Sequence, residues 1–363
     1  MEVAGRAARL REGLDAAGCD ALLVTRLVNL RYLTGFTGSA GLLLVLPDEL
    51  VLVTDGRYRD QSAEELAAAG VDARIEVGTT GASQRETMGA AARGRPRLGL
   101  EAESVTWGQQ RRFGAEWFPG AELVPTSNLV EGLRRVKDPG EVDRMAAAAA
   151  AADAALDDVR ATLAEGPTER ELALALDVAM RRHGATGPSF DTIVASGPNG
   201  AKPHHRPTDR RIEAGELVVL DFGAIVDGYC SDMTRTVCVG EPPATARRMV
   251  EVVGDSQQAG VAAVRAGAEV GAVDGACRQV ITDAGWGDAF LHPTGHGVGL
   301  EIHEGPRLAA GSTDTLRAGD VVTVEPGVYL PDVGGVRIED TMVVEAQGCR
   351  VLTRSPKELV IAP

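Results

Sequence analysis

The sequence predicts an α/β protein of two domains, with the smaller domain at residues 1–130 and the larger at 131–363. In the first part of the chain, short apolar runs alternate with helical patterns, which is typical of a sheet covered by helices. In the second part, two long apolar runs flank an Asp-Gly pair at 227–228, a strong short-range signal for a β-hairpin. Between them, the segment DPGE at 138–141 has the N-cap, first-turn proline and third-position glutamate of a helix start. The domain boundary is therefore expected just before this helix.

The smaller domain is expected to hold its strands in one sheet with helices against it. Glycine, proline and polar residues bound the apolar runs, and longer segments show helical spacing. Strands are expected at 21–24, 41–46, 50–54, 97–100 and 122–124, and helices at about 2–17, 57–69 and 106–116. No histidine lies in this domain, so we expect the chemistry of the protein to reside in the larger one.

Helices make up much of the larger domain outside the hairpin. An Ala-rich helix is expected from 139 to about 163, where helix propensity is high. A second capping box, Thr168 with Glu171, starts the next helix. Two more helices are expected at about 244–265 and 270–284, each ended by a glycine.

The hairpin aligns two acidic residues. If Asp-Gly at 227–228 forms the loop, Asp221 pairs with Thr234, and Asp232 lies two positions along the same strand. Side chains alternate faces with a period of two, so Asp221 and Asp232 share a face and lean toward a common point. Two carboxylates so placed among apolar residues repel each other unless a cation lies between them. The alternative is an ordinary solvated hairpin face.

A second cluster of polar residues lies in LHPTGHGVGLEIHE at 291–304, which contains three of the six histidines. Its proline and glycines oppose a helix, and the sequence has no HExxH or Gly-Lys-Ser/Thr motif, which argues against a helical zinc site and a phosphate-binding loop. Glycine beside histidine lets a metal ion or a substrate approach closely. His292, His296 and His303 therefore form a candidate functional cluster, although a single such histidine would be an ordinary packed or surface residue.

Two glutamates interrupt apolar strands farther along the chain. Glu325 follows VVTV at the end of one strand, and Glu339 is expected within a second strand, with Arg337 on the same face. A buried glutamate is unusual unless its charge is neutralised. An edge strand with solvated acids would explain each glutamate taken singly.

Asp221, Asp232, His296, Glu325 and Glu339 together form one donor set. Four carboxylates and one imidazole are hard ligands that suit Mn, Co or Fe(II) better than a structural zinc ion. Four negative charges exceed what one divalent ion neutralises, so we expect two metal ions that activate a shared water and polarise a carbonyl group.

The composition argues against several classes of function. The formal net charge is -15, whereas nucleic-acid binding needs a clustered basic surface. The five cysteines are scattered without CxxC spacing, so a reduced, cytoplasmic setting is expected. No signal peptide and no apolar stretch of about 18 residues is visible, so we expect no membrane association.

Five motifs of the larger domain resemble those of the pita-bread metallopeptidases, in particular their aminopeptidase P and prolidase branch. The motifs are LDFGA, SDMTRT, GHGVGLEIHE, VEPGVY and GGVRIED. SGPNGAKPHHRP, RRVKDPGEVDRM, NLRYLTGFTGSAG and LVTDGRY are also similar to the family, so the resemblance covers nearly the whole chain. It implies a creatinase-like N-terminal domain and a C-terminal pita-bread domain with two divalent metal ions. Mn(II) is the expected metal, with Co(II) or Zn(II) as alternatives.

The resemblance also implies roles for the metal ligands. Asp221 is expected to hold one ion, and His296 and Glu325 the other. Asp232 and Glu339 are expected to bridge both ions. A glutamate, Glu325 in this chain, is expected to carry the proton as well.

Other residues are implied around the substrate. Three histidines are expected to contact it: His204, His292 and His303. His204 has the family spacing for stabilising the tetrahedral intermediate, and Arg337 and Tyr329 are expected to orient the ligands. His205 stands where relatives commonly carry a small residue, which leaves the width of the pocket near His204 open.

The implied activity is that of a Xaa-Pro aminopeptidase, which acts on small proline-containing peptides, and the family suggests a homodimer. The alternative is a Xaa-Pro dipeptidase, or prolidase, which must recognise the free carboxylate after proline with a rigid cation. Arg337 is assigned to the metal ligands and Arg317 to a surface turn. Arg307 could reach the pocket, but its flexible, glycine-rich segment argues against a rigid clamp, so we favour the aminopeptidase. Arg57 from the N-terminal domain of a dimer partner is an open alternative for the cation. The N-terminal domain argues against a methionine aminopeptidase. The intact ligand set argues against a metal-free creatine-type hydrolase or binding protein.

Overall fold

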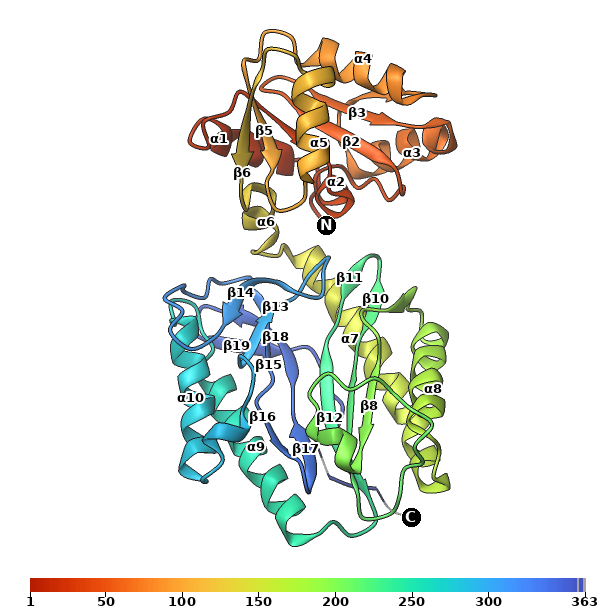
Figure 1. Cartoon of the computed structure of the whole chain (residues 1–363), viewed down its shortest axis with the longest axis vertical. Coiled ribbons are helices and arrows are strands. Elements are labelled where there is room, and N and C mark those ends of the chain that lie inside the picture. The colour runs from red at the N-terminus through yellow and green to blue at the C-terminus, as the bar shows by residue number, and fades with distance from the viewer. Residues whose placement is uncertain (358, 362–363) are drawn as a thin grey trace. The chain divides into compact units, whose positions relative to one another are not determined.

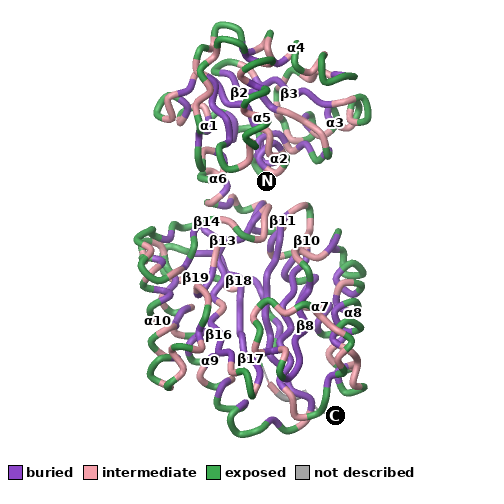
Figure 2. The backbone as a smooth tube through the Cα atoms, viewed as in Figure 1, coloured by how far each residue is buried: buried purple, intermediate pink, exposed green. Residues whose placement is uncertain are grey.

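The computed structural model describes residues 1–357 and 359–361, and the chain divides into two compact units, Met1–Arg134 and Arg135–Pro363 (Figure 1). Each unit has its own buried apolar clusters. Most strands of both units are buried, whereas the helices expose one side (Figure 2). Both units are mixed α/β, as predicted.

The N-terminal unit is built on a single sheet. Its strands are β1 (Ala21–Val24), β2 (Gly41–Val45), β3 (Leu50–Thr54), β4 (Arg74–Val77), β5 (Arg97–Glu101) and β6 (Glu122–Thr126). Their order is β4-β3-β2-β1-β5-β6, with β1, β2 and β3 antiparallel and the outer strands added in parallel. The helices are α1 (Arg6–Leu14), α2 (Leu27–Thr34), α3 (Arg59–Ala69), α4 (Gly81–Ala91), α5 (Trp107–Arg112) and α6 (Leu129–Arg134).

The strands predicted for this unit are all present, but sequence patterns missed α2, β4, α4 and α6. β4 is exposed or half-buried along its length, so it lacks the apolar alternation of a strand. α4 buries Met88 alone, so its helical spacing is equally weak. The helix predicted at 106–116 is shorter, because α5 gives way to a π-helical turn at Phe113–Trp117.

In its described residues, the C-terminal unit contains two main sheets and two small ones. Its helices are α7 (Pro139–Arg160), α8 (Glu169–Arg182), α9 (Ala244–Ala263) and α10 (Val270–Asp283). Its strands are β7 (Gly187–Pro188), β8 (Ile193–Ser196), β9 (Leu217–Phe222), β10 (Ala224–Val226), β11 (Tyr229–Cys230), β12 (Met233–Val239), β13 (Gly295–Gly297), β14 (Glu304–Leu308), β15 (Val321–Val324), β16 (Gly327–Leu330), β17 (Gly334–Arg337), β18 (Asp340–Glu345), β19 (Gly348–Val351) and β20 (Val360–Ile361). The main sheets have the orders β20-β12-β9-β8 and β14-β13-β15-β18-β19, and the small ones β11-β10-β7 and β16-β17.

A pair of helices covers each main sheet of this unit. One apolar cluster joins α7 and α8 to β8, β9 and β12, and it includes Leu176 and Leu220. A second cluster joins α9 and α10 to β15 and β18, through residues such as Val253 and Met342. The strands thus lie between the two helix pairs (Figure 1). Hydrophobic burial on both sides stabilises this arrangement.

The predicted register of the hairpin is confirmed. Asp221 of β9 pairs with Thr234 of β12. Asp227 and Gly228 have positive φ angles of 47° and 78°, as a type I′ turn requires. Turn chemistry and strand periodicity therefore agree at this position.

Both strands of the hairpin are nevertheless interrupted at the same position along its length. Gly223 separates β9 from β10, and Ser231 and Asp232 separate β11 from β12. A Cβ atom at Gly223 would fall 1.9 Å from the Ser231 carbonyl oxygen, so the close approach of the two strands requires glycine. Asp232 therefore lies in the break, rather than inside a strand.

Both predicted capping boxes are present, Asp138 with Glu141 at α7 and Thr168 with Glu171 at α8. They start the helices where the sequence places them. Across residues 1–357 and 359–361, no helix has both the length and the apolar character needed to span a membrane.

Candidate metal centre

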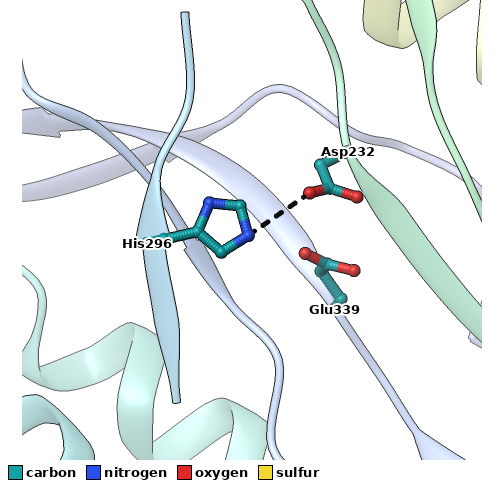
Figure 3. Close-up of side chains that lie close together, drawn as sticks. All are labelled: Asp232, His296 and Glu339. Atoms are coloured by element: carbon teal, nitrogen blue, oxygen red, sulfur yellow. Dashed lines mark ion pairs between the residues drawn. The ribbon is translucent and has the colours of Figure 1, made fainter. Parts of the chain in front are cut away.

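Three side chains that can bind a metal ion converge in the C-terminal unit: Asp232, His296 and Glu339 (Figure 3). One ligand atom from each lies within 4.8 Å of the others. Within this group, Asp232 Oδ2 lies 3.5 Å from His296 Nε2. Glu339, expected within a strand, lies instead in the short link between β17 and β18. The chain changes sheets there, which frees the side chain to turn toward the other two.

Glu325 and Asp221 lie beside this group. Glu325 directly follows β15, and its Oε1 lies 3.4 Å from His296 Nε2. Asp221 lies on β9 and faces the same cavity. All five predicted ligands therefore line one cavity, from five separate places in the chain.

Burial raises the pKa of three of these carboxyl groups. The pKa of Glu325 rises to about 8. The pKa values of Asp232 and Glu339 lie well above the usual range, through burial first and through neighbouring carboxylates second. Burial also lowers the pKa of His296 to about 4, so its ring is neutral at pH 7. Acids so crowded around a neutral ring ionise together only if a cation joins them.

Two details of the cluster fit such a cation. Oε1 of Glu339 is buried and, among the described residues, has no hydrogen-bond partner. Nδ1 of His296 lies 2.9 Å from the Gly297 carbonyl oxygen, which can only accept, so the neutral ring carries its proton on Nδ1. The lone pair on Nε2 then points toward carboxylate oxygens. Carboxylates with one imidazole are ligands that suit hard divalent ions such as Mn(II).

Arg337 connects the predicted ligands with the predicted substrate side. Its guanidinium donates to Asp221 Oδ2 at 2.6 Å and to the Tyr329 hydroxyl at 2.7 Å. The Tyr329 hydroxyl also lies 2.8 Å from His292 Nε2. A continuous network thus runs from Asp221 to His292, with every member except His292 buried or nearly so.

The cavity beside the carboxylates has a volume of about 1100 Å³. Its lining includes the three predicted substrate histidines: His204, His292 and His303. The ring of His303 packs edge-on against His296, with centroids 4.4 Å apart. Burial, followed by the charge of Arg337, lowers the pKa of His292 to about 4. Burial also lowers the pKa of His303, so these two rings are neutral near pH 7 and available for hydrogen bonds to a substrate.

Helix α10 holds the segment that carries His292, which sequence patterns did not reveal. Arg278 donates to the His292 carbonyl oxygen at 2.9 Å and forms an ion pair with Asp274. Asp274 is buried and accepts hydrogen bonds from the backbone N–H and the hydroxyl of Thr294. The only sequence signal was the i, i+4 spacing of Asp274 and Arg278, which usually marks a surface pair.

His205, the departure from the family pattern, turns toward helix α8. Its Nε2 lies 3.0 Å from the carboxylate of Glu169, and its side chain is 9% exposed. Glu169 is fully buried, which by itself raises its pKa. Hydrogen bonds from the Ser196 backbone, Thr208, Asn199 and His205 outweigh burial and bring the pKa down to about 2.

Replacing Glu169 with glutamine is expected to remove a pH-dependent contribution to the free energy of unfolding. The pKa of Glu169 is about 2 in the folded chain against 4.5 ordinarily. Its ionised form therefore stabilises the fold fully above pH ~4.5, by roughly 3 kcal/mol, and this contribution is lost as the pH falls toward 2. In urea unfolding, the stability difference between wild type and Glu169→Gln should shrink by roughly 2 kcal/mol from pH 7 to pH 3. An equal difference at both pH values would contradict the depressed pKa.

Arg307 corrects an expectation about flexibility. The sequence placed it in a flexible, glycine-rich segment, but it lies in β14 and pairs directly with His296 of β13. Opposite residues of antiparallel strands project from the same face, and Arg307 accordingly lines the cavity. The pairing of β14 with β13 holds the backbone of Arg307 beside the cavity.

Comparisons with known proteins cover both units. A model described as metallopeptidase family M24 matches residues 143–346, and one described as the creatinase/prolidase N-terminal domain matches residues 6–136. A Xaa-Pro dipeptidase from Pyrococcus furiosus is 33% identical, over 98% of this chain and 99% of that protein.

Solved structures agree with these matches. A Xaa-Pro dipeptidase from Bacillus anthracis is 40% identical and superimposes with a TM-score of 0.93, over 98% of this chain and 99% of that one. An X-Pro aminopeptidase from Thermotoga maritima is 32% identical with a TM-score of 0.86, over 96% of this chain and 100% of that one. The chain therefore belongs to metallopeptidase family M24, with a creatinase/prolidase N-terminal domain and the pita-bread fold of the Xaa-Pro dipeptidases and X-Pro aminopeptidases.

Proposed function

We propose that this protein is a Xaa-Pro dipeptidase, which hydrolyses the single peptide bond of dipeptides ending in proline. The proposal departs from the aminopeptidase favoured by sequence. Its main support is the position of Arg307, and its second support is the dipeptidase activity named for relatives from Pyrococcus furiosus and Bacillus anthracis.

Arg307 has the properties of a carboxylate clamp. It pairs with His296 across two strands and lines the same cavity as the metal ligands, so it brings a positive charge to that cavity. No described residue forms an ion pair with its guanidinium, so the charge is available to a ligand. A planar guanidinium binds a carboxylate through two parallel hydrogen bonds, and a dipeptide ending in proline presents such a carboxylate.

The proposed metal ligands are Asp221, Asp232, His296, Glu325 and Glu339, around two divalent ions for which Mn(II) is favoured over Co(II) or Zn(II). Ions held there would supply an activated water and polarise the scissile carbonyl group.

The side chains of the cavity perform the remaining steps. Glu325 accepts a proton from the attacking water and returns it to the proline nitrogen, which needs a proton to leave. His204 and His303 donate hydrogen bonds to the oxygen on which negative charge develops. His292, held by Tyr329, lines the side that receives the proline ring.

The cytoplasmic setting and the homodimer stay predictions from the sequence. All five cysteines are free thiols, which is compatible with a reducing compartment.

Substrate length tests the proposal. Xaa-Pro dipeptides should be hydrolysed with a higher kcat/KM than the matching Xaa-Pro-Yaa tripeptides when Mn(II) is present. Arg307→Ala should raise KM for the dipeptides by roughly 10- to 100-fold, the loss expected for a charge-assisted pair. The matched control is Arg317→Ala, because Arg317 is exposed and does not line the cavity.

The opposite result is equally clear. Tripeptides cleaved at least as well as dipeptides, with Arg307→Ala without effect on either, would favour the aminopeptidase expected from sequence.

A further inference from the structure

Helix α8 begins with a carboxylate that lies inside the protein. Glu169 is 0% exposed, although it stands at the first position of the helix, where acidic residues usually face solvent. Its donors come from one short stretch of chain, at distances of 2.7–3.3 Å: Ser196, Asn199, His205 and Thr208. One buried side chain thus gathers the whole segment that leads from β8 past the cavity.

This segment carries His204 at its tip. Residues 202–205 form a turn, closed by a hydrogen bond of 3.0–3.1 Å at each end, from Lys202 N–H to Asn199 and from His205 N–H to Lys202. On the far side of the turn, the His205 ring binds Glu169 at 3.0 Å. On the near side, the Pro203 carbonyl oxygen accepts a longer contact of 3.4 Å from Arg337. The two neighbours of His204 are therefore both held, one toward α8 and one toward the metal ligands.

The other contacts of the turn are at the surface. His204 and Pro203 line the cavity, while the exposed Lys202 and Arg206 contact Asn199 and Asp191. Apolar packing therefore contributes little to the position of the His204 ring. The hydrogen bonds to Glu169 are the main restraint on this side of the cavity, because charge-assisted hydrogen bonds are stronger than neutral ones.

We propose that Glu169, acting through His205, is a positioning residue that fixes His204 against the reacting carbonyl group. This inference rests on the proposed hydrolysis of Xaa-Pro dipeptides. Glu169 touches neither substrate nor metal ligands, so its effect reaches the reaction only through the His204 turn. A misplacement of about 1 Å at a reacting group costs on the order of 100-fold in rate.

A double-mutant cycle tests this coupling in the Mn(II)-loaded enzyme. Glu169→Gln is expected to lower kcat by roughly 10- to 100-fold while metal content and KM change little. In a His204→Ala background, Glu169→Gln should add almost no further loss, because the group that it positions is gone. Glu171→Gln, on the same helix turn but exposed, is the matched control and should leave kcat unchanged.

His205 variants test the same link with less disturbance of the fold. His205→Ala should lower kcat in the same sense, and His205→Gln, which keeps an N–H donor, should restore most of it. If Glu169→Gln fails to fold, these two variants carry the test, again with and without His204→Ala. Equal losses in both backgrounds would overturn the proposal, since they would mean a general loss of structure.

Amide hydrogen exchange reports how firmly the turn at residues 202–205 is held, and it needs no catalysed reaction. In the metal-free protein, amides of residues 202–208 should exchange faster in Glu169→Gln than in wild type, while the rest of α8 stays protected. Unchanged exchange in this segment would overturn the proposal. Inactivity of the wild-type protein toward Xaa-Pro dipeptides, with the exchange result as expected, would contradict the proposed function alone.

Discussion

Replacing Asp232 with asparagine is expected to remove bound metal and to lower the hydrolysis of Xaa-Pro dipeptides by more than about 100-fold. Even residues that only orient a metal ligand typically cost 10- to 100-fold when changed, and Asp232 is proposed to bridge both ions. Its Oδ2 lies 3.5 Å from His296 Nε2, and its pKa is raised by burial and by Glu339, so the ionised form depends on a cation. An amide cannot supply the negative charge that balances the ions.

The measurement is metal content per chain, followed by kcat. Asp227→Asn is the matched control, because Asp227 lies on the exposed turn of the same hairpin and asparagine tolerates its positive φ angle. Chelation of the wild-type enzyme should abolish activity in the same way, and Mn(II) or Co(II) should restore it. An Asp232→Asn variant with wild-type metal content and rate would refute the bridging role.

Replacing His303 with alanine is expected to lower kcat by roughly 100- to 1000-fold without loss of metal. The ring lies 4.4 Å from His296 and lines the cavity, so it reaches the space where a substrate would sit. Because burial lowers its pKa, the ring is neutral at pH 7 and offers an N–H donor. Removing one donor to a developing oxyanion typically costs this much in rate.

This second prediction is checked by kcat and by metal analysis of the same preparation. His183→Ala serves as the control. His183 is exposed at the end of α8, forms an ion pair with Asp158 and does not line the cavity. Metal lost together with turnover would mean that His303 binds metal, and its assignment to the substrate side of the cavity would be wrong.

Local features of this protein could be predicted well from the sequence. The hairpin register follows from an Asp-Gly pair with positive φ angles and from the two-residue period of a strand. The capping boxes at Asp138 and Thr168 depend on side chains three residues apart. Strands of the N-terminal unit were found where their apolar runs are continuous. Elements without such a run, such as β4, were missed.

The sequence by itself also predicted the five candidate metal ligands and the three candidate substrate histidines, because the motifs name their residue types and order. Tertiary structure decided how they are placed. Glu339 turns inward from a link between two sheets, and the backbone of Arg307 is held beside the cavity by its pairing with His296. In the sequence, Glu169 has the position of an ordinary acidic residue at a helix start. Only the folded chain brings the hydrogen-bond donors of residues 196–208 around its carboxylate. Local backbone preferences depend on neighbouring residues, so the sequence predicts them. The partner of a buried charge depends on packing between segments far apart in the chain, so only the tertiary structure identifies it.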